Sequence, residues 1–217
     1  MPDLDFQITG VKPAQRGLTP LLHFSVRINV SPATEAIQAL ILQAQIQIQS
    51  PQRTYKGEEK ERLLDIFGPR ERWGQTLRNR LWTQTNTTTG PFTGSTEAIL
   101  AVPCTFDLNV LATKYFQALA EGDIPLLFLF SGSIFYGAED GRLQVQRISW
   151  EKECVYRMPL RAWQELMEHH YPNTAWLSLR RDTFDRLCAY KRAGGLSTWE
   201  ETIERLLPEL EGLEAMA

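Results

Sequence analysis

Hydrophobic and polar residues alternate along two segments in the first fifty positions of the chain. In residues 21–30 the apolar side chains occupy the even positions, and in residues 40–49 four glutamines alternate with aliphatic side chains. A period of two residues is typical of a β-strand with one buried and one solvated face. The segment from Asp5 to Val11 alternates more weakly and predicts an edge strand that ends before Pro13.

Further extended segments follow in the middle of the chain. Residues 92–107 read as extended with an interruption at Pro103, and the apolar run 124–130 suits a strand buried on both faces. The Asp140–Gly141 pair predicts a tight hairpin turn, with returning strands over 143–150 and 154–158. Together these patterns predict about seven strands at hairpin-like spacing, and therefore an antiparallel β-sandwich over residues 1–158.

The hydrophobic period changes to that of a helix at three places. A short helical excursion is predicted near residues 57–80, and a short helix over the second half of residues 109–120. After residue 158 the pattern predicts a helix over 160–170, a second one that ends at Gly194–Gly195, and a third one that runs to about residue 207. The third helix starts with a capping box at either Ser197–Glu200 or Thr198–Glu201.

The predicted fold class is therefore α+β, with a β-sandwich body and a three-helix C-terminal segment packed on it. Residues 1–158 form the body, and residues 159–217 form a helical subdomain. The length of 217 residues allows one large domain or a body with a smaller appendage.

Composition and charge exclude several classes of protein. Hydrophobic residues make up 43% and charged residues 23% of the chain, which is typical of a globular protein. The formal net charge of −3 argues against a protein whose main ligand is a nucleic-acid backbone. The first residues lack the features of a secretory signal, and no apolar run is long enough to span a membrane, so we expect a cytoplasmic protein.

Catalytic, cofactor and metal motifs are not recognisable in the sequence. The three histidines are His23 and the adjacent pair His169–His170, and neighbouring helical residues point about 100° apart, which disfavours a shared metal. The segment Ser131–Gly132–Ser133 lies inside a predicted strand, where glycine marks a bulge or a close backbone approach rather than a nucleophile elbow. We therefore predict no catalytic residue, no cofactor and no metal ligand.

Aromatic and arginine residues are concentrated in the last seventy positions of the chain. Tryptophan, tyrosine and arginine are favoured at the energetic centres of protein interfaces. The alternative is that these rings attach the C-terminal helices to the sandwich. The predicted partner-binding residues are Trp150, Tyr156, Trp163, Tyr171, Trp176, Arg180 and Arg181.

Two functional hypotheses follow from these observations. The first is a non-enzymatic accessory protein that presents this surface to a protein partner. The second is a small-molecule binding protein or a hydrolase with a pocket between sandwich and helices, in which His169 or His170 lies near Arg157 and Glu153. Self-association through an edge strand or the glutamine-lined face also stays open.

Three stretches of the sequence together resemble an uncharacterised bacterial family of about this length. They are Phe106–Asp107 with 114–116, then 124–132 leading to 135–136, and Met158–Pro159 with Trp163, 171–173 and Trp176. The resemblance extends over nearly the whole chain. Members of this family accompany [NiFe]-hydrogenase gene clusters, which implies an accessory or assembly role for this chain and assigns no functional residue.

Overall fold

The alternating segments form the strands of two antiparallel sheets, which a computed structural model describes for residues 1–14, 17–105, 110–138, 142–175 and 177–207. The smaller sheet has the strand order β1-β2-β6, and the larger sheet has the order β4-β3-β7-β8, with β5 paired to β3 and β9 paired to β7. The bounds of the strands are β1 Asp3–Pro13, β2 Leu21–Ser31, β3 Ala36–Ile48, β4 Arg80–Thr89, β5 Phe92–Thr93, β6 Ser95–Pro103, β7 Asp123–Gly137, β8 Leu143–Arg147 and β9 Glu153–Pro159. The predicted sandwich is confirmed, with nine strands rather than about seven.

The core lies between the two sheets and is rich in aromatic rings that pack edge-to-face or stacked. The ring of Phe24 on β2 lies 5.3 Å from that of Phe128 on β7, and the ring of Phe6 on β1 lies 4.5 Å from that of Phe130. All four side chains are buried. Since burial of one such side chain is worth about 1.5–3 kcal/mol, these cross-sheet pairs are a main source of the stability of the sandwich.

Gly132 allows two strands of the larger sheet to approach closely. Its φ is +142°, and a β-carbon at this position would overlap the carbonyl oxygen of Ile41 on β3. Glycine is the residue that tolerates both conditions. The close backbone approach predicted for the Ser131–Gly132–Ser133 segment is therefore confirmed, and this segment belongs to β7.

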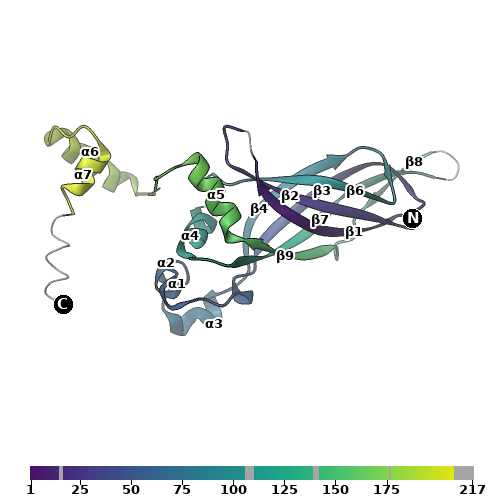
Figure 1. Cartoon of the computed structure of the whole chain (residues 1–217), viewed down its shortest axis with the longest axis horizontal. Coiled ribbons are helices and arrows are strands. Elements are labelled where there is room, and N and C mark those ends of the chain that lie inside the picture. Colours follow the sequence, from purple (N-terminus) through teal and green to yellow (C-terminus); the bar gives the residue numbers. More distant parts are fainter. Residues whose placement is uncertain (15–16, 106–109, 139–141, 176, 208–217) are drawn as a thin grey trace. The chain divides into compact units, whose positions relative to one another are not determined.

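Short helices lie at one end of the sandwich, opposite the end that carries β8 (Figure 1). The first of these helices confirm the helical excursion predicted near residues 57–80. A later helix begins at residue 110, whereas the sequence predicted a helix only over the second half of residues 109–120. Helix α5 confirms the helix predicted over 160–170 and contacts β1, β2 and β9. The bounds of these helices are η1 Ser50–Gln52, α1 Gly57–Arg62, α2 Leu64–Phe67, η2 Arg70–Arg72, α3 Trp73–Thr76, α4 Val110–Ala118 and α5 Leu160–His170.

The chain divides into two units, Met1–Thr174 and Ala175–Ala217. Helix α5 belongs to the first unit, because its apolar face, including Leu160 and Leu166, is buried against the sandwich. The second unit contains α6 Arg181–Ala193 and α7 Trp199–Glu204. The division lies after residue 174, whereas the sequence pattern placed the start of the helical subdomain at residue 159.

The turn predicted at Asp140–Gly141 lies outside the described residues. On either side of these residues, the backbone N–H of Ala138 donates to the carbonyl of Arg142 at 2.8 Å.

Within the described ranges, each helix is too short or too polar to cross a lipid bilayer.

Candidate functional site

The second unit contains an apolar groove between its two helices. Phe184 and Leu187 of α6 lie one turn apart on the same helix face, and Trp199 and Ile203 of α7 face them. Leu177 and Leu179 of the segment before α6 complete the lining. The groove has a volume of about 220 Å³, enough for a few apolar side chains of a binding partner.

The side chains in this groove are unusually open to solvent for an apolar cluster. Leu177 is 69% exposed and Phe184 is 42% exposed, and Ile203, Leu206 and Leu207 are also exposed. Every residue of α6 is described, and none of them is buried. When a helix has an apolar face but no buried residue, that face is still open for packing against another surface. The groove is therefore a surface that can receive apolar groups.

Local contacts fix the geometry of this groove without a central core. The ring of Phe184 lies 5.5 Å from that of Trp199, and Lys191 Nζ lies 5.7 Å from the centre of the same Trp199 ring. The Lys191 ammonium also donates to the carbonyls of Leu196 and Ser197, each at 2.7 Å. These bonds join the end of α6 to the turn before α7, so the two helices keep their relative orientation.

Helix α7 begins with a capping box, which the sequence predicted at one of two places. Thr198 Oγ1 accepts a hydrogen bond from the backbone N–H of Glu201 at 3.1 Å, and the Glu201 carboxylate accepts from the backbone N–H of Thr198. The pair is therefore Thr198–Glu201 rather than Ser197–Glu200. Hydrogen bonds from Ser197 and Thr198 stabilise the charged form and lower the pKa of Glu201.

The arginines predicted to bind a partner stand at the beginning of α6. Arg180 pairs with Asp182 at 3.4 Å and Arg181 pairs with Asp185 at 3.3 Å, while all four side chains remain largely in solvent. Such exposed pairs contribute little to stability, and they leave the guanidinium groups accessible. Trp176 lies outside the described residues.

The other four predicted residues belong to the first unit and have different environments. Trp163 is 6% exposed, and its ring packs 5.4 Å from that of Phe116, so it serves the core. Tyr156 is half-buried with its ring 6.2 Å from Phe24. Tyr171 follows α5 and is partly buried against the core, whereas Trp150 is 90% exposed on the turn between β8 and β9. Trp150 alone of these four presents a whole ring to solvent.

The sequence pattern missed most of the groove residues. Phe184 and Leu187 were recognised as the apolar face of a helix but not as the wall of a groove. The missing consideration is size, because a unit of about 40 residues without disulfides or metal does not bury a complete core. An amphipathic helix in such a small unit predicts an open apolar surface.

A second hollow, of about 490 Å³, lies in the first unit beside the start of β7. Its centre is an ion pair between Arg53 Nη2 and Glu59 Oε1 at 2.9 Å, with side chains only 8% and 2% exposed. Glu59 also accepts from the backbone N–H groups of Lys56 and Ala120, and Arg53 donates to the carbonyls of Glu121 and Asp123. The two charges satisfy each other and hold α1 against the segment before β7.

Burial by itself opposes ionisation of Glu59, but the hydrogen bonds from Lys56 and Ala120 and the Arg53 guanidinium outweigh it and lower its pKa. Beside this pair, the hydroxyl groups of Tyr55 and Tyr115 lie 2.9 Å apart, and the Tyr55 hydroxyl donates to the carbonyl of Ser50. Burial raises the pKa of both tyrosines. These groups keep fixed protonation states near neutral pH, which suits a structural clasp better than proton transfer.

The residues of the small-molecule hypothesis lie in different hollows. Arg157 lines the hollow around Arg53, whereas His169 lines a shallow depression on α5 with Gln164, Glu165 and Glu168. The rings of His169 and His170 lie 5.2 Å apart at 88°. Among the residues that the structure describes, three or more His, Cys, Asp or Glu side chains do not gather in an arrangement suited to a metal ion. Burial raises the pKa of the Cys104 thiol to about 12, as expected of a reduced core cysteine.

The chain belongs to a family of unknown function, DUF6084, whose sequence profile matches residues 1–214. The family assignment agrees with the resemblance to an uncharacterised family found in the sequence. No curated protein matches the chain.

Several solved structures share a low similarity with the chain. A β-glucosidase from Kluyveromyces marxianus is 11% identical, with 72% of this chain and 15% of that chain covered and a TM-score of 0.24. A protein from Bordetella pertussis named as an ApaA protein is 14% identical, with 73% and 95% covered and a TM-score of 0.26. The β-glucosidase 3B from Thermotoga neapolitana is 12% identical, with 72% and 17% covered and a TM-score of 0.26. Both β-glucosidases are therefore matched over less than a fifth of their length, and TM-scores this low do not define a shared fold or function.

Proposed function

We propose that this chain is a non-enzymatic accessory protein that binds a partner protein through the apolar groove of its C-terminal unit. The observation that carries the proposal is the exposed apolar face of α6, which has no buried residue although Phe184 and Leu187 lie on it. An exposed apolar surface of this kind is characteristic of an interaction site.

The occupant that fits this groove is an amphipathic helix with charged residues on both sides of its apolar face. A groove between two helices receives the apolar stripe of a third helix through residues spaced three or four apart. Helix α6 contains four basic and two acidic residues, and α7 contains three glutamates, so the two walls of the groove carry net charges of +2 and −3. A partner helix is therefore expected to place acidic side chains beside α6 and basic side chains beside α7.

The family resemblance extends this proposal to the identity of the partner. Because the resemblance implies an association with [NiFe]-hydrogenase gene clusters, the proposed partner takes part in the assembly of a metalloenzyme such as a hydrogenase. The arginines at positions 180 and 181 stand at the entrance of α6 and remain among the proposed contacts.

Site-specific crosslinking in the native host tests the proposal. A photo-reactive phenylalanine analogue replaces Phe184 in the groove, and in a matched control it replaces Arg186, which lies about 200° away around α6. We expect the analogue at position 184 to crosslink one protein and the analogue at position 186 to crosslink none. The same product from both positions would contradict a groove-specific contact.

The crosslinked protein is then purified and its affinity for the full chain is measured. Leu187→Glu places a charge in the groove and is expected to weaken binding at least tenfold, or about 1.4 kcal/mol. Ala189→Glu adds the same charge at an exposed position of α6 outside the groove and is expected to leave the affinity within twofold of the original. Equal losses in both variants, at equal helix content, would refute the proposal.

A further inference from the structure

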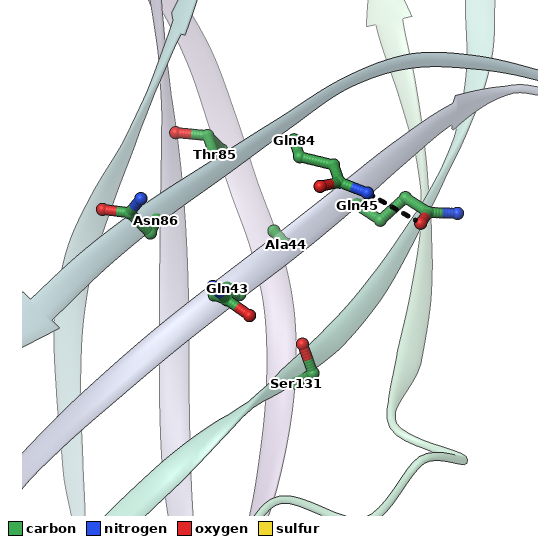
Figure 2. Close-up of a pocket in the computed structure, with 7 residues that line it drawn as sticks. All are labelled: Gln43, Ala44, Gln45, Gln84, Thr85, Asn86 and Ser131. Atoms are coloured by element: carbon green, nitrogen blue, oxygen red, sulfur yellow. Dashed lines mark hydrogen bonds between the residues drawn. The ribbon is translucent and has the colours of Figure 1, made fainter.

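The outer face of the larger sheet carries a polar groove that is separate from the proposed protein-binding groove. It has a volume of about 330 Å³ and lies where β4, β3 and β7 run side by side (Figure 2). In the strand register, Gln43 lies opposite Asn86 on β4 and opposite Ser131 on β7, and Gln45 lies opposite Gln84. Figure 2 shows Gln43 and Gln45 on one strand, Gln84 and Asn86 on the neighbouring strand, and Ser131 on a third strand.

The chemistry of this groove is polar but uncharged. The seven described residues that line it carry amide, hydroxyl or methyl groups and no ionisable group. Each side-chain amide offers two donors and one acceptor oxygen, and a serine hydroxyl offers one donor and an acceptor. Gln84 Nε2 donates to Gln45 Oε1 at 3.2 Å, which orients both amides and leaves their remaining groups for a ligand.

Such a groove favours a neutral ligand that is rich in hydroxyl groups. A charged ligand would lose part of its hydration here without gaining an opposite charge. A purely apolar ligand would leave the amides without hydrogen bonds. A ligand with many hydroxyls can both donate to the amide oxygens and accept from the amide nitrogens.

An exposed tryptophan stands on a loop that is fixed beside this groove. The backbone N–H of Phe130 donates to the carbonyl of Lys152 at 2.8 Å, and that of Ile148 donates to the carbonyl of Gly132 at 3.1 Å. These two bonds attach residues 148–152 to the strand on both sides of Ser131. Trp150 is in this loop and is 90% exposed. Its position contributes little to the core, so the ring is available for a ligand.

We propose that the polar groove and Trp150 form a binding site for a neutral oligosaccharide. A pyranose ring combines equatorial hydroxyls with an apolar C–H face, and these two features match the amide rows and the indole ring respectively. Gln43, Gln45 and Asn86 bind hydroxyl groups, Ser131 contributes a further hydrogen bond, and the indole of Trp150 covers a C–H face of a neighbouring sugar unit.

Nuclear magnetic resonance of the full-length chain tests this site. The protein, labelled with ¹⁵N, is titrated with maltotetraose, cellotetraose and chitotetraose up to about 20 mM, well above a Kd of about 1 mM. We expect at least one of them to shift the side-chain amide signals of Gln43 and Gln45 together with the indole N–H signal of Trp150. If none of the three sugars shifts these signals, the proposal is wrong.

Four variants separate this site from other surfaces. Trp150→Ala and Gln43→Leu are each expected to weaken sugar binding at least tenfold, while Gln7→Leu, the same change on an exposed position of β1, leaves it unchanged. Shifts that persist in Trp150→Ala and Gln43→Leu, or an anionic oligogalacturonate that binds more tightly than every neutral sugar, would overturn the proposal. Leu187→Glu in the protein-binding groove is expected to leave sugar binding unchanged, so the two proposals fail independently.

Discussion

The two units of this chain differ in how they bury their apolar residues. In the first unit, side chains from facing sheets such as Phe24 and Phe128 are fully buried against each other. In the second unit, the apolar face of α6 has no buried residue, and Phe184 remains 42% exposed. The sandwich therefore derives its stability from internal contacts, whereas the apolar side chains of the helical unit stay largely in contact with solvent.

The largest expected effect comes from truncating one aromatic ring in each unit. Phe128→Ala removes a fully buried ring and should lower the free energy of unfolding of the sandwich by about 3–5 kcal/mol. Phe184→Ala removes a ring of similar size from the open groove and should change this free energy by less than about 0.5 kcal/mol. Urea denaturation, followed by circular dichroism in the region of the β-sheet signal, measures both values.

A comparable loss in the two variants would contradict the contrast between the units. Val26→Ala is a control within the sandwich, because it removes a smaller buried side chain and should have an intermediate effect.

The next largest effect is expected from the buried ion pair of Arg53 and Glu59. Glu59→Gln keeps the shape of the side chain but leaves the Arg53 guanidinium buried without a counter-charge. Removal of one partner of a buried pair costs about 3 kcal/mol or more. The free energy of unfolding at neutral pH should fall accordingly, while Glu97→Gln, which affects the exposed pair with Arg27, should have almost no effect.

The difference in unfolding free energy between wild type and Glu59→Gln should also depend on pH, in a direction set by the lowered pKa of Glu59. The folded protein lowers the pKa of Glu59 below its ordinary value of 4.5, so the stabilisation is fully present above that value and is lost as the pH falls further. The difference in unfolding free energy between wild type and Glu59→Gln should therefore shrink below about pH 4.5. A difference that stays constant down to pH 2.5 would show that the charge of Glu59 does not matter, since over this range the carboxyl of Glu59 takes up its proton in the unfolded chain and favours unfolding if the folded protein holds the charged form.

The smallest expected effect concerns the cap of α7. Thr198→Ala removes the hydroxyl that accepts from the backbone N–H of Glu201 and should destabilise this helix by about 1 kcal/mol. The effect should appear as faster amide hydrogen exchange in residues 199–204 and leave β7 unchanged. Ser197→Ala is the comparison, because it removes a hydrogen bond to the Glu201 carboxylate but leaves the bond from the Glu201 backbone N–H to Thr198, and its effect should be smaller. Faster exchange in β7 would contradict the expectation that the effect stays within the helical unit.

The sandwich was largely predictable from the sequence, and the open groove was not. The alternation around Leu22–Val30 and in residues 40–49 identifies strands because one face of each is buried, and a period of two residues follows directly. The pattern also identified α5, which ends at the predicted His170. It predicted that α5 packs on the sandwich but grouped it with the later helices in one subdomain, because an amphipathic stripe shows that a helix packs but does not show which helices belong together.

The candidate residues show that the sequence does not separate tryptophans that pack in the core from tryptophans on the surface. Trp163 and Trp150 are both tryptophans near basic residues, yet one fills the core against Phe116 and the other is exposed on a turn. Composition does not separate them, because the same ring serves packing and binding. The polar groove was likewise visible only as a row of glutamines, since its third side, at Ser131, depends on the pairing of β3 with β7.

The close approach at Gly132 also has an evolutionary consequence. Because a β-carbon there would overlap the Ile41 carbonyl, a homologue that loses this glycine has to shift β7 relative to β3. Such a shift would displace Ser131 and, through the bonds to Phe130 and Gly132, the loop of Trp150. One glycine without a side chain thus sets the spacing of two strands and, through them, the position of a loop outside the sheet.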